Sequence, residues 1–146
     1  MLPQGFECLE YYGLGPGENY CDRKLASHLA IHKSMIHEQH FPFVPPAECG
    51  GHDETRWLLL KNENGAALRI ASKNPFHFDI HHNTVQDYIN ATHDHKLPKR
   101  TESYLHIDAK HGPIGSEMAW STLSPAAYAL HGGSYNIAFD IECENA

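Results

Sequence analysis

The stretch Phe76-His77-Phe78-Asp79-Ile80-His81 decides the fold class, because apolar and polar residues alternate along it without a break. A period of two predicts a β-strand with one buried and one solvated face. The same alternation recurs at 104–108, at 135–141, and around Leu25, Leu29 and Ile31. Strands are therefore expected to make up most of the chain.

A hairpin and one short helix complete the expected elements. The apolar runs 57–60 and 66–70 flank Asn62-Glu63-Asn64-Gly65, and Asn-Gly tolerates the positive φ that tight hairpin turns require. Thr84 can cap a helix in which Val85, Tyr88 and Ile89 share one face. We predict an all-β fold, an antiparallel two-sheet β-sandwich with one short helix, in which residues 1–146 form a single unit.

The composition excludes several classes of protein. Asp and Glu outnumber Lys and Arg by 18 to 11 in the 146 residues, which argues against binding to a nucleic-acid backbone. No apolar run approaches the length of a membrane helix. The four cysteines contain no Cys-x-x-Cys pair, so we interpret them as free thiols in a reducing, cytoplasmic compartment.

Thirteen histidines raise the question of a metal site. The pairs His28/His32 and His77/His81 have the i, i+4 spacing that places two imidazoles on one helix face. On a strand, however, the same spacing separates them by about 13 Å, which is too far for one ion. Both pairs fall on the polar face of predicted strands. We therefore expect solvated histidines and no metal, and no third ligand lies near His93-Asp94-His95 in sequence.

Three segments are more specific than the strand pattern. The first runs from Tyr12 to Arg23 and contains Gly13-Leu14-Gly15-Pro16-Gly17-Glu18-Asn19-Tyr20. The second is Phe43–Gly50 with Thr55-Arg56-Trp57, and the third is Ile107–Trp120. In this order they closely resemble segments of the C-terminal domain, or small chain, of β-galactosidases of glycoside hydrolase family 2.

The resemblance implies both a fold and an activity. The family's domain is an antiparallel supersandwich akin to galactose mutarotase, roughly twice as long as this chain, which would be its C-terminal half. The parent enzymes hydrolyse terminal β-galactosides such as lactose with two glutamates, a pair that retaining chemistry requires. In the family these lie on a separate TIM barrel, and the magnesium and sodium ligands also lie elsewhere. The resemblance therefore implies no catalytic residue, metal or cofactor in this chain.

A sugar-binding role is implied for the third segment. Trp120 matches the tryptophan that reaches the active-site mouth, where an indole can pack against the apolar face of a sugar. Taken alone, it would more often be a core or interface tryptophan, and the matching spacing from Asp108 onward favours the sugar contact instead. His111 and Glu117 lie in the same loop and are further candidates. The family's Gly-Asp-Asp-Ser is replaced here by residues 116–119, Ser-Glu-Met-Ala.

Five charged residues of the matching segments are expected to anchor loops rather than to catalyse. Carboxylates in glycine-rich loops commonly accept backbone N–H groups or pair with arginine. The expected loop-anchoring residues are Glu18, Asp22, Arg23, Glu48 and Arg56.

The leading hypothesis is a non-catalytic fragment of a β-galactosidase that completes the sugar pocket and packs against the rest of the enzyme, as one chain or as a large subunit. Its ligand would be a galactoside. The alternatives are a stand-alone carbohydrate-binding module and, with no matching motif, an aldose epimerase. A half domain would expose apolar surface and strand edges, so we expect the isolated chain to self-associate, without nucleic-acid or membrane partners.

Overall fold

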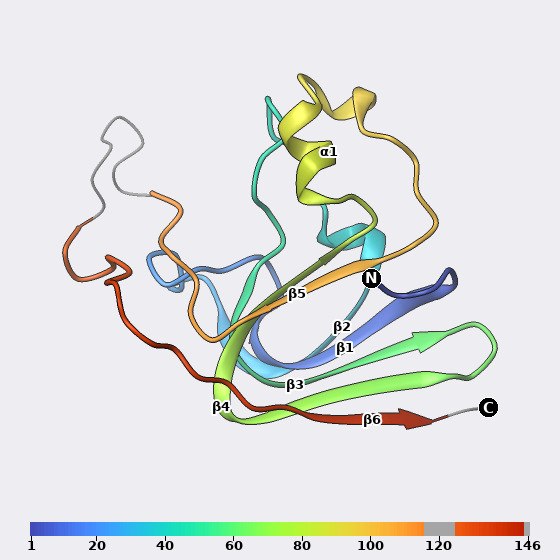
Figure 1. The fold of residues 1–146 in the computed structure, drawn as a ribbon, viewed down its shortest axis with the longest axis horizontal. Coiled ribbons are helices and arrows are strands. Elements are labelled where there is room, and N and C mark those ends of the chain that lie inside the picture. The colour runs from blue at the N-terminus through green and yellow to red at the C-terminus, as the bar shows by residue number, and fades with distance from the viewer. Residues whose placement is uncertain (116–124, 145–146) are drawn as a thin grey trace.

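Antiparallel strands are the main regular structure of the computed structural model, which describes residues 1–115 and 125–144 (Figure 1). The strands are β1 (Phe6–Gly15), β2 (His28–Met35), β3 (His52–Asn62), β4 (Ala67–His81), β5 (Tyr104–Asp108) and β6 (Asp140–Glu144). The helical elements are the 3-10 turns η1 (Ile36–Gln39) and η2 (Asp94–Lys96) and the short helix α1 (Val85–Asn90). The predicted all-β antiparallel fold with one short helix is confirmed.

The long strand β4 organises the sheet, whose strand order is β2-β1-β3-β4-β5. One edge of β4 pairs with β3. The other edge pairs with β6 over residues 67–71 and with β5 over residues 77–81. Figure 1 shows β4 turning between these two stretches, so the sheet is sandwich-like rather than flat. The described strands thus form one continuous sheet in place of two separate ones.

The predicted β3–β4 hairpin is present. The side-chain Oδ1 of Asn62 accepts hydrogen bonds from the backbone N–H groups of Asn64 (3.0 Å) and Ala66 (2.9 Å). Gly65 has a φ of 85°, which glycine adopts without strain. The turn chemistry at 62–65 therefore fixes the register in which Leu60 opposes Leu68.

Strand β1 was not expected, because glycines punctuate its second half. Gly13 and Gly15 lie inside the strand and serve close packing rather than a turn. A Cβ on Gly13 would lie 2.5 Å from the Thr55 hydroxyl, and one on Gly15 would collide with the Tyr11 hydroxyl. Only glycine lets β1 approach these side chains so closely.

The predicted strand at 135–141 is wrong for most of its length. Only Asp140 and Ile141 belong to β6, which continues to Glu144. Ile137 and Phe139 instead pack against the core without strand pairing. Pairing begins at Asp140, which lies opposite Ala71. Ala71 is the last residue of the β4 stretch that pairs with β6.

The predicted faces of β2 are also reversed. Leu29 and Ile31 were expected to be buried, but they are 44 % and 57 % exposed, and Leu25 lies before the strand in full contact with solvent. The register pairs His32 with Tyr11, whose side chain belongs to the core. Because β2 is an edge strand, only its histidine-bearing face meets the core cluster.

Helix α1 begins as predicted. The Thr84 hydroxyl accepts the N–H of Asp87 (3.1 Å), and the Asp87 carboxylate accepts the N–H of Thr84 (2.8 Å), which completes a capping box. Arg100 donates two hydrogen bonds to Asp87 (2.6 and 2.8 Å) and holds the pKa of that carboxyl well below its usual range. The predicted apolar face is exposed at Val85 and Ile89.

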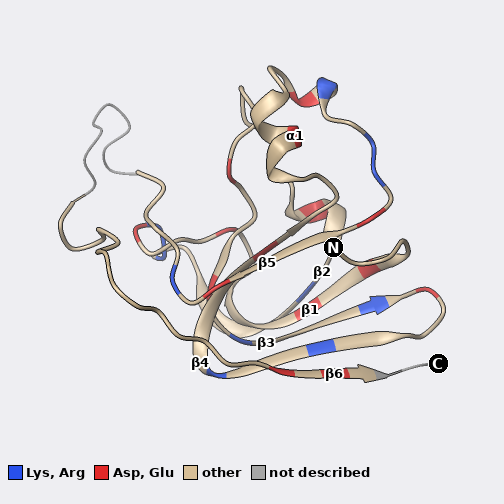
Figure 2. Ribbon diagram, in the orientation of Figure 1, with Lys and Arg blue, Asp and Glu red and all other residues tan. Residues whose placement is uncertain are grey.

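Charged residues are scattered over the molecule. Figure 2 shows Lys and Arg on β3, on β4, in the loop after β1 and in the connection from α1 to β5, separated from one another. Within residues 1–115 and 125–144, no helix is long and apolar enough to cross a membrane.

The core lies between the curved strands and η1. Among the described residues it contains nine buried side chains, which are Leu9, Tyr11, Ile36, Leu58, Leu60, Ile70, Phe76, Phe78 and Ile80. Aromatic rings meet edge to face at its centre, where Tyr11 and Phe78 have centroids 5.3 Å apart.

Two neighbouring leucines on β3 test which face of the sheet is the core. Leu58 is fully buried, whereas Leu59 points to the opposite face and is only partly buried. We expect Leu58→Ala to lower the free energy of unfolding by about 2–5 kcal/mol. Leu59→Ala should cost about 1 kcal/mol or less. Urea denaturation measures both, and equal losses would contradict the assigned core.

Candidate functional site

Three loops meet at one end of the sheet, and we call this region the loop end. Its segments are 16–27 after β1, 40–51 before β3 and 109–115 after β5. The fully buried Asn19 joins the first two. Its backbone N–H donates to the Gly51 carbonyl (2.8 Å), its side-chain Oδ1 accepts from the Asp53 N–H (2.8 Å), and its Nδ2 donates to the Leu14 carbonyl (2.9 Å).

Two predicted anchoring carboxylates also bridge these loops. Glu18 accepts the N–H of Gly50 (3.0 Å) and the guanidinium of Arg23 (2.6 Å). Asp22 accepts the N–H groups of Ile114 (3.2 Å) and Gly115 (2.9 Å). Glu18 therefore joins the first loop to the second, and Asp22 joins the first loop to the third. Their oxygens have protein partners, which suits a positioning role.

Glu48 and Arg56 lie in different surroundings. Glu48 has no hydrogen bond to any residue that the structure describes, and it lies near Asp79, Asp108 and His111. Partial burial and the charge of Asp79 raise the pKa of Glu48. Arg56 lies on β3, with its guanidinium 5.6 Å from the centroid of the Tyr12 ring and in contact with the carbonyl and carboxylate of Glu54. Glu54 in turn pairs with Lys24 of the first loop, so Arg56 borders the loop end and is joined to Glu54 rather than to the other four predicted anchors.

An aromatic stack connects the sheet to the third loop. The rings of His77 and His111 are nearly parallel, with centroids 4.4 Å apart, and Tyr20 lies 5.5 Å from His77 and 5.4 Å from His111. Tyr20 is fully buried, and its hydroxyl accepts the N–H of Gly51 (3.2 Å). The stack therefore fixes His111 beside the loops that Asn19 holds.

The prediction that His77 and His81 are solvated is wrong. His77 is 1 % exposed and His81 is 5 % exposed, because the second loop covers this face of β4. A Cβ on Gly51 would lie 2.7 Å from the His77 ring, so the backbone packs directly on the imidazole. Both ring nitrogens of His77 lack a hydrogen-bond partner among residues 1–115 and 125–144.

The predicted separation of His28 and His32 is also wrong, since their ring centroids are 5.2 Å apart. The His32 Nε2 lies 3.3 Å from the carbonyl oxygen of His28, which draws the ring back along the strand. The backbone spacing of a strand therefore does not set the distance between two long side chains on the same face.

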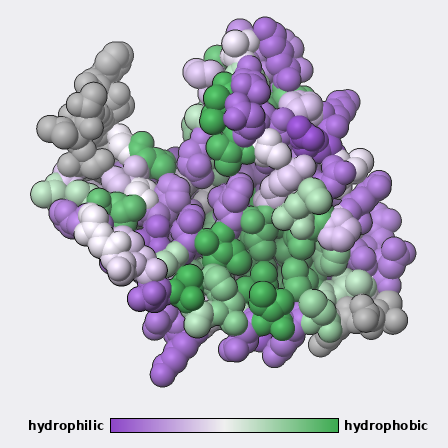
Figure 3. Space-filling model, viewed as in Figure 1, coloured by the Kyte–Doolittle hydropathy of each residue, from purple (hydrophilic) through white to green (hydrophobic). Residues whose placement is uncertain are grey.

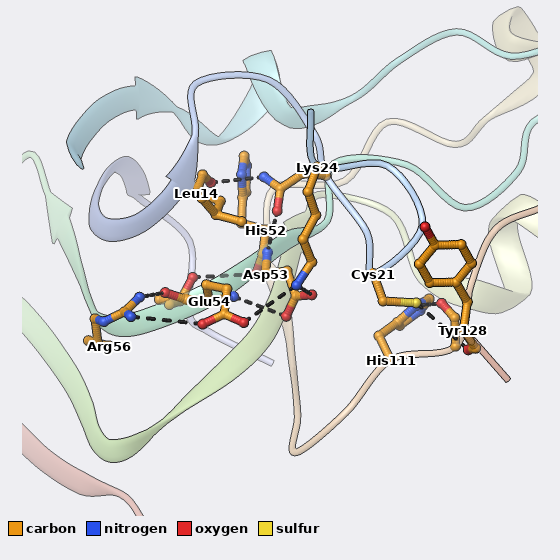
Figure 4. Close-up of polar contacts among 12 residues, drawn as sticks. Leu14, Cys21, Lys24, His52, Asp53, Glu54, Arg56, His111 and Tyr128 are labelled. Atoms are coloured by element: carbon orange, nitrogen blue, oxygen red, sulfur yellow. Dashed lines mark hydrogen bonds and ion pairs between the residues drawn. The ribbon is translucent and has the colours of Figure 1, made fainter. Parts of the chain in front are cut away.

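A cavity of about 340 Å³ opens beside His111. It is lined by Cys21, Lys24, Asp53, Glu54, Pro75, Ala109, Lys110 and His111. Lys24 Nζ lies 2.8 Å from Asp53 Oδ2 and 3.4 Å from Glu54 Oε1, as Figure 4 shows. Burial disfavours its charge, but the two carboxylates outweigh burial and raise the pKa of Lys24.

The volume of this cavity falls in the range of small-molecule sites, and its lining is mostly polar. Its ammonium, carboxylates and imidazole can donate to and accept from hydroxyl groups. Of the three predicted substrate-binding residues, the structure describes only His111, which lines the cavity. Trp120 and Glu117 lie outside the described residues, in the segment that follows Gly115.

A family model for the β-galactosidase small chain matches residues 1–141. This chain belongs to that family. A β-galactosidase of Priestia megaterium is 29 % identical over 138 residues, which cover 94 % of this chain and 13 % of that protein. A β-galactosidase of Staphylococcus xylosus is 28 % identical over 141 residues, which cover 97 % of this chain and 14 % of that protein. Beta-galactosidase 2 of Enterobacter cloacae is 34 % identical over 122 residues, 82 % of this chain and 11 % of that protein.

The small-chain segment therefore spans about an eighth of the length of these relatives. The motif segments can be recognised in the sequence, but the residues whose hydrogen bonds and packing join these segments were not predicted. Asn19 and Tyr20 follow Glu18 in the first motif and could have been chosen there as buried anchors. Nothing in the local sequence separates His77, which the loop buries, from an exposed strand histidine.

Buried neutral histidines make stability depend on pH. Burial lowers the pKa of His52 to about 3 and that of His77 to about 4, from 6.5. Below about pH 6.5 the unfolded chain binds protons that the folded chain does not. The free energy of unfolding should therefore fall as the pH falls from 6.5 toward 4, by up to about 1.4 kcal/mol per pH unit for each histidine.

Urea denaturation across this range measures the slope. His77→Gln should flatten it by removing the contribution of His77, whereas His93→Gln, at an exposed position, should leave it unchanged. A stability that does not change between these pH values would contradict the burial of neutral imidazoles.

Proposed function

We propose that this small-chain segment acts as part of a β-galactosidase, in which it completes the pocket for terminal β-galactosides such as lactose. The match of residues 1–141 to the small-chain family carries the proposal. The catalytic glutamates and the magnesium and sodium sites are proposed to lie on other parts of the enzyme, which account for most of the length of its relatives.

The arrangement of the loop end supports a binding rather than a catalytic contribution. Glu18 and Asp22 accept hydrogen bonds from other loops, so they hold backbone rather than substrate. His111 lines a polar cavity and is fixed by stacking on His77. We propose that this loop carries His111, Glu117 and Trp120 toward the sugar, with the indole packing on its apolar face.

The two tryptophans of the chain provide a matched pair for testing this role. Trp57 lies on β3, where Arg69 lies over its ring at 6.0 Å. In the full-length enzyme, Trp120→Ala should lower kcat/KM for lactose about 10-fold or more, since it removes a large stacking surface. Trp57→Ala should change kcat/KM by less than about 2-fold. Equal effects of the two substitutions would remove Trp120 from the sugar pocket.

The isolated 146-residue chain should not hydrolyse a chromogenic β-galactoside, because retaining hydrolysis needs a nucleophile and an acid/base that we place elsewhere. Turnover that survives purification would contradict this. Titration with galactose, monitored by tryptophan fluorescence, tests whether the isolated chain binds sugar by itself. Saturable binding by the chain alone would favour a stand-alone carbohydrate-binding module.

We propose that the partner of this chain is the remainder of the β-galactosidase. Seven apolar side chains that pack against the core are only partly buried, namely Leu2, Phe6, Leu68, Leu105, Ile107, Ile137 and Phe139. Figure 3 shows apolar side chains gathered on the surface over the strands. Apolar surface of this kind commonly marks an interface. The four free cysteines support a reducing, cytoplasmic compartment.

Without that partner, the isolated chain should self-associate. Edge strand β2 exposes Ile31 at 57 %, next to unpaired backbone groups. Light scattering should show species larger than a monomer, and Ile31→Lys should reduce them. A monomer at high protein concentration would contradict the proposed exposed interface.

A further inference from the structure

Three potential metal ligands that lie far apart in sequence meet beside helix α1. They are His40 at the end of η1, Cys49 in the second loop and His81 at the end of β4. Each offers one ligand atom, and these atoms all lie within 4.8 Å of one another. Cys49 is 2 % exposed and His81 is 5 % exposed, so the cluster is largely shielded from solvent.

The hydrogen bonds of His81 leave one imidazole nitrogen unused. Its Nε2 lies 2.9 Å from the carbonyl oxygen of Cys49, so this nitrogen carries the proton and donates. Its Nδ1 is buried and has no hydrogen-bond partner in the part of the chain that the structure describes. A buried nitrogen lone pair without a partner is costly, and a metal ion would satisfy it. Burial also lowers the pKa of His81, which keeps the ring in the neutral form that binds metals.

His40 is held in a matching state. Its Nε2 donates to the carboxylate Oδ1 of Asp94 at 2.5 Å. Nδ1 then accepts hydrogen bonds from the Tyr88 hydroxyl (3.1 Å) and the Cys49 thiol (3.9 Å), and a metal ion would replace both at this lone pair. A carboxylate on the far nitrogen of an imidazole is the usual support of a metal-binding histidine.

The burial of Cys49 argues against a nucleophilic role for its thiol. Burial raises the pKa of Cys49 to about 11, so the group is protonated at neutral pH. Reactive cysteines have lowered pKa values and are accessible to solvent. A buried thiol beside two imidazoles becomes a thiolate when a cation replaces its proton.

We propose that His40, Cys49 and His81 bind a zinc ion. One thiolate and two imidazoles are ligands that zinc favours. A cavity of about 30 Å³, lined in part by Cys49, His81 and Tyr88, lies beside the cluster and has room for one water as the fourth ligand. On binding, the Cys49 S–H proton is released to solvent and an S–Zn bond forms.

Tetrahedral zinc would draw the ligands together. With Zn–S near 2.3 Å and Zn–N near 2.0–2.1 Å, the ligand atoms would lie about 3.3–3.6 Å apart. The largest separation in the cluster therefore has to shorten by roughly 1 Å. His40 and Cys49 lie near the two ends of the second loop, whose backbone can supply this movement. The ion would then fasten that loop to the end of β4.

Metal analysis and cobalt substitution test the site in the 146-residue chain. Zinc should bind at about one ion per chain and raise the melting temperature, and cobalt should give a thiolate charge-transfer band with tetrahedral d–d absorption. Cys49→Ser should abolish the band and weaken zinc binding at least about 100-fold. The matched control Cys8→Ser removes an exposed cysteine and should leave both unchanged.

A second comparison separates the site from surface histidines. His81→Gln should remove zinc binding, whereas His28→Gln, on the exposed end of β2, should not. Asp94→Asn keeps every ligand and should weaken binding about 10- to 100-fold, since it loosens the support of His40. A Cys49→Ser chain that is folded by circular dichroism and binds zinc as tightly as the parent would overturn the proposal. Absence of the cobalt charge-transfer band in the parent would also overturn it.

Discussion

The backbone of Gly50 and Gly51 packs directly on the imidazole rings of His81 and His77, and the loop end depends on this contact. Any side chain at Gly51 would lie within 2.7 Å of the His77 ring, and one at Gly50 would collide with both the Gln39 carbonyl and His81. Because the two glycines lie so close, the Gly51 carbonyl and the Gly50 N–H reach the first loop. Gly50 and Gly51 thus allow the second loop to bury a face of β4 that would otherwise be exposed to solvent.

Local signals predicted the elements that local interactions determine. The Asn-Gly turn, the Thr84 cap and the alternation at 104–108 each act within a few residues, and each element formed where expected. The failures have a common cause in tertiary packing. The alternation of apolar and polar residues indicated which residues share a face of a strand. Whether that face is exposed to solvent depends on segments distant in sequence. The second loop buried His77, and the edge position of β2 exposed Ile31.

The candidate site was predictable to a different extent for each kind of residue. Motif resemblance located the loops and the charged residues within them, and Glu18 and Asp22 do bridge loops. It did not indicate that Arg56 lies over Tyr12 and pairs with Glu54. The cluster of His40, Cys49 and His81 has no sequence signature, since its members are separated by 9 and 32 residues. Only the fold brings these three atoms together.

The connection between β4 and β5 is closed at its base. Leu2 and Ser103 exchange backbone hydrogen bonds of 2.7 and 3.4 Å, His82 Nδ1 donates to the Glu102 carbonyl at 3.1 Å, and Arg100 clamps Asp87. The two ends of this connection are therefore held in place whichever residues form its middle part, or tip. Loop-closure entropy grows only slowly with length, so residues can be inserted or removed near its tip at little cost to the sheet. Chain-length differences among relatives, and engineered fusions, should be best tolerated there.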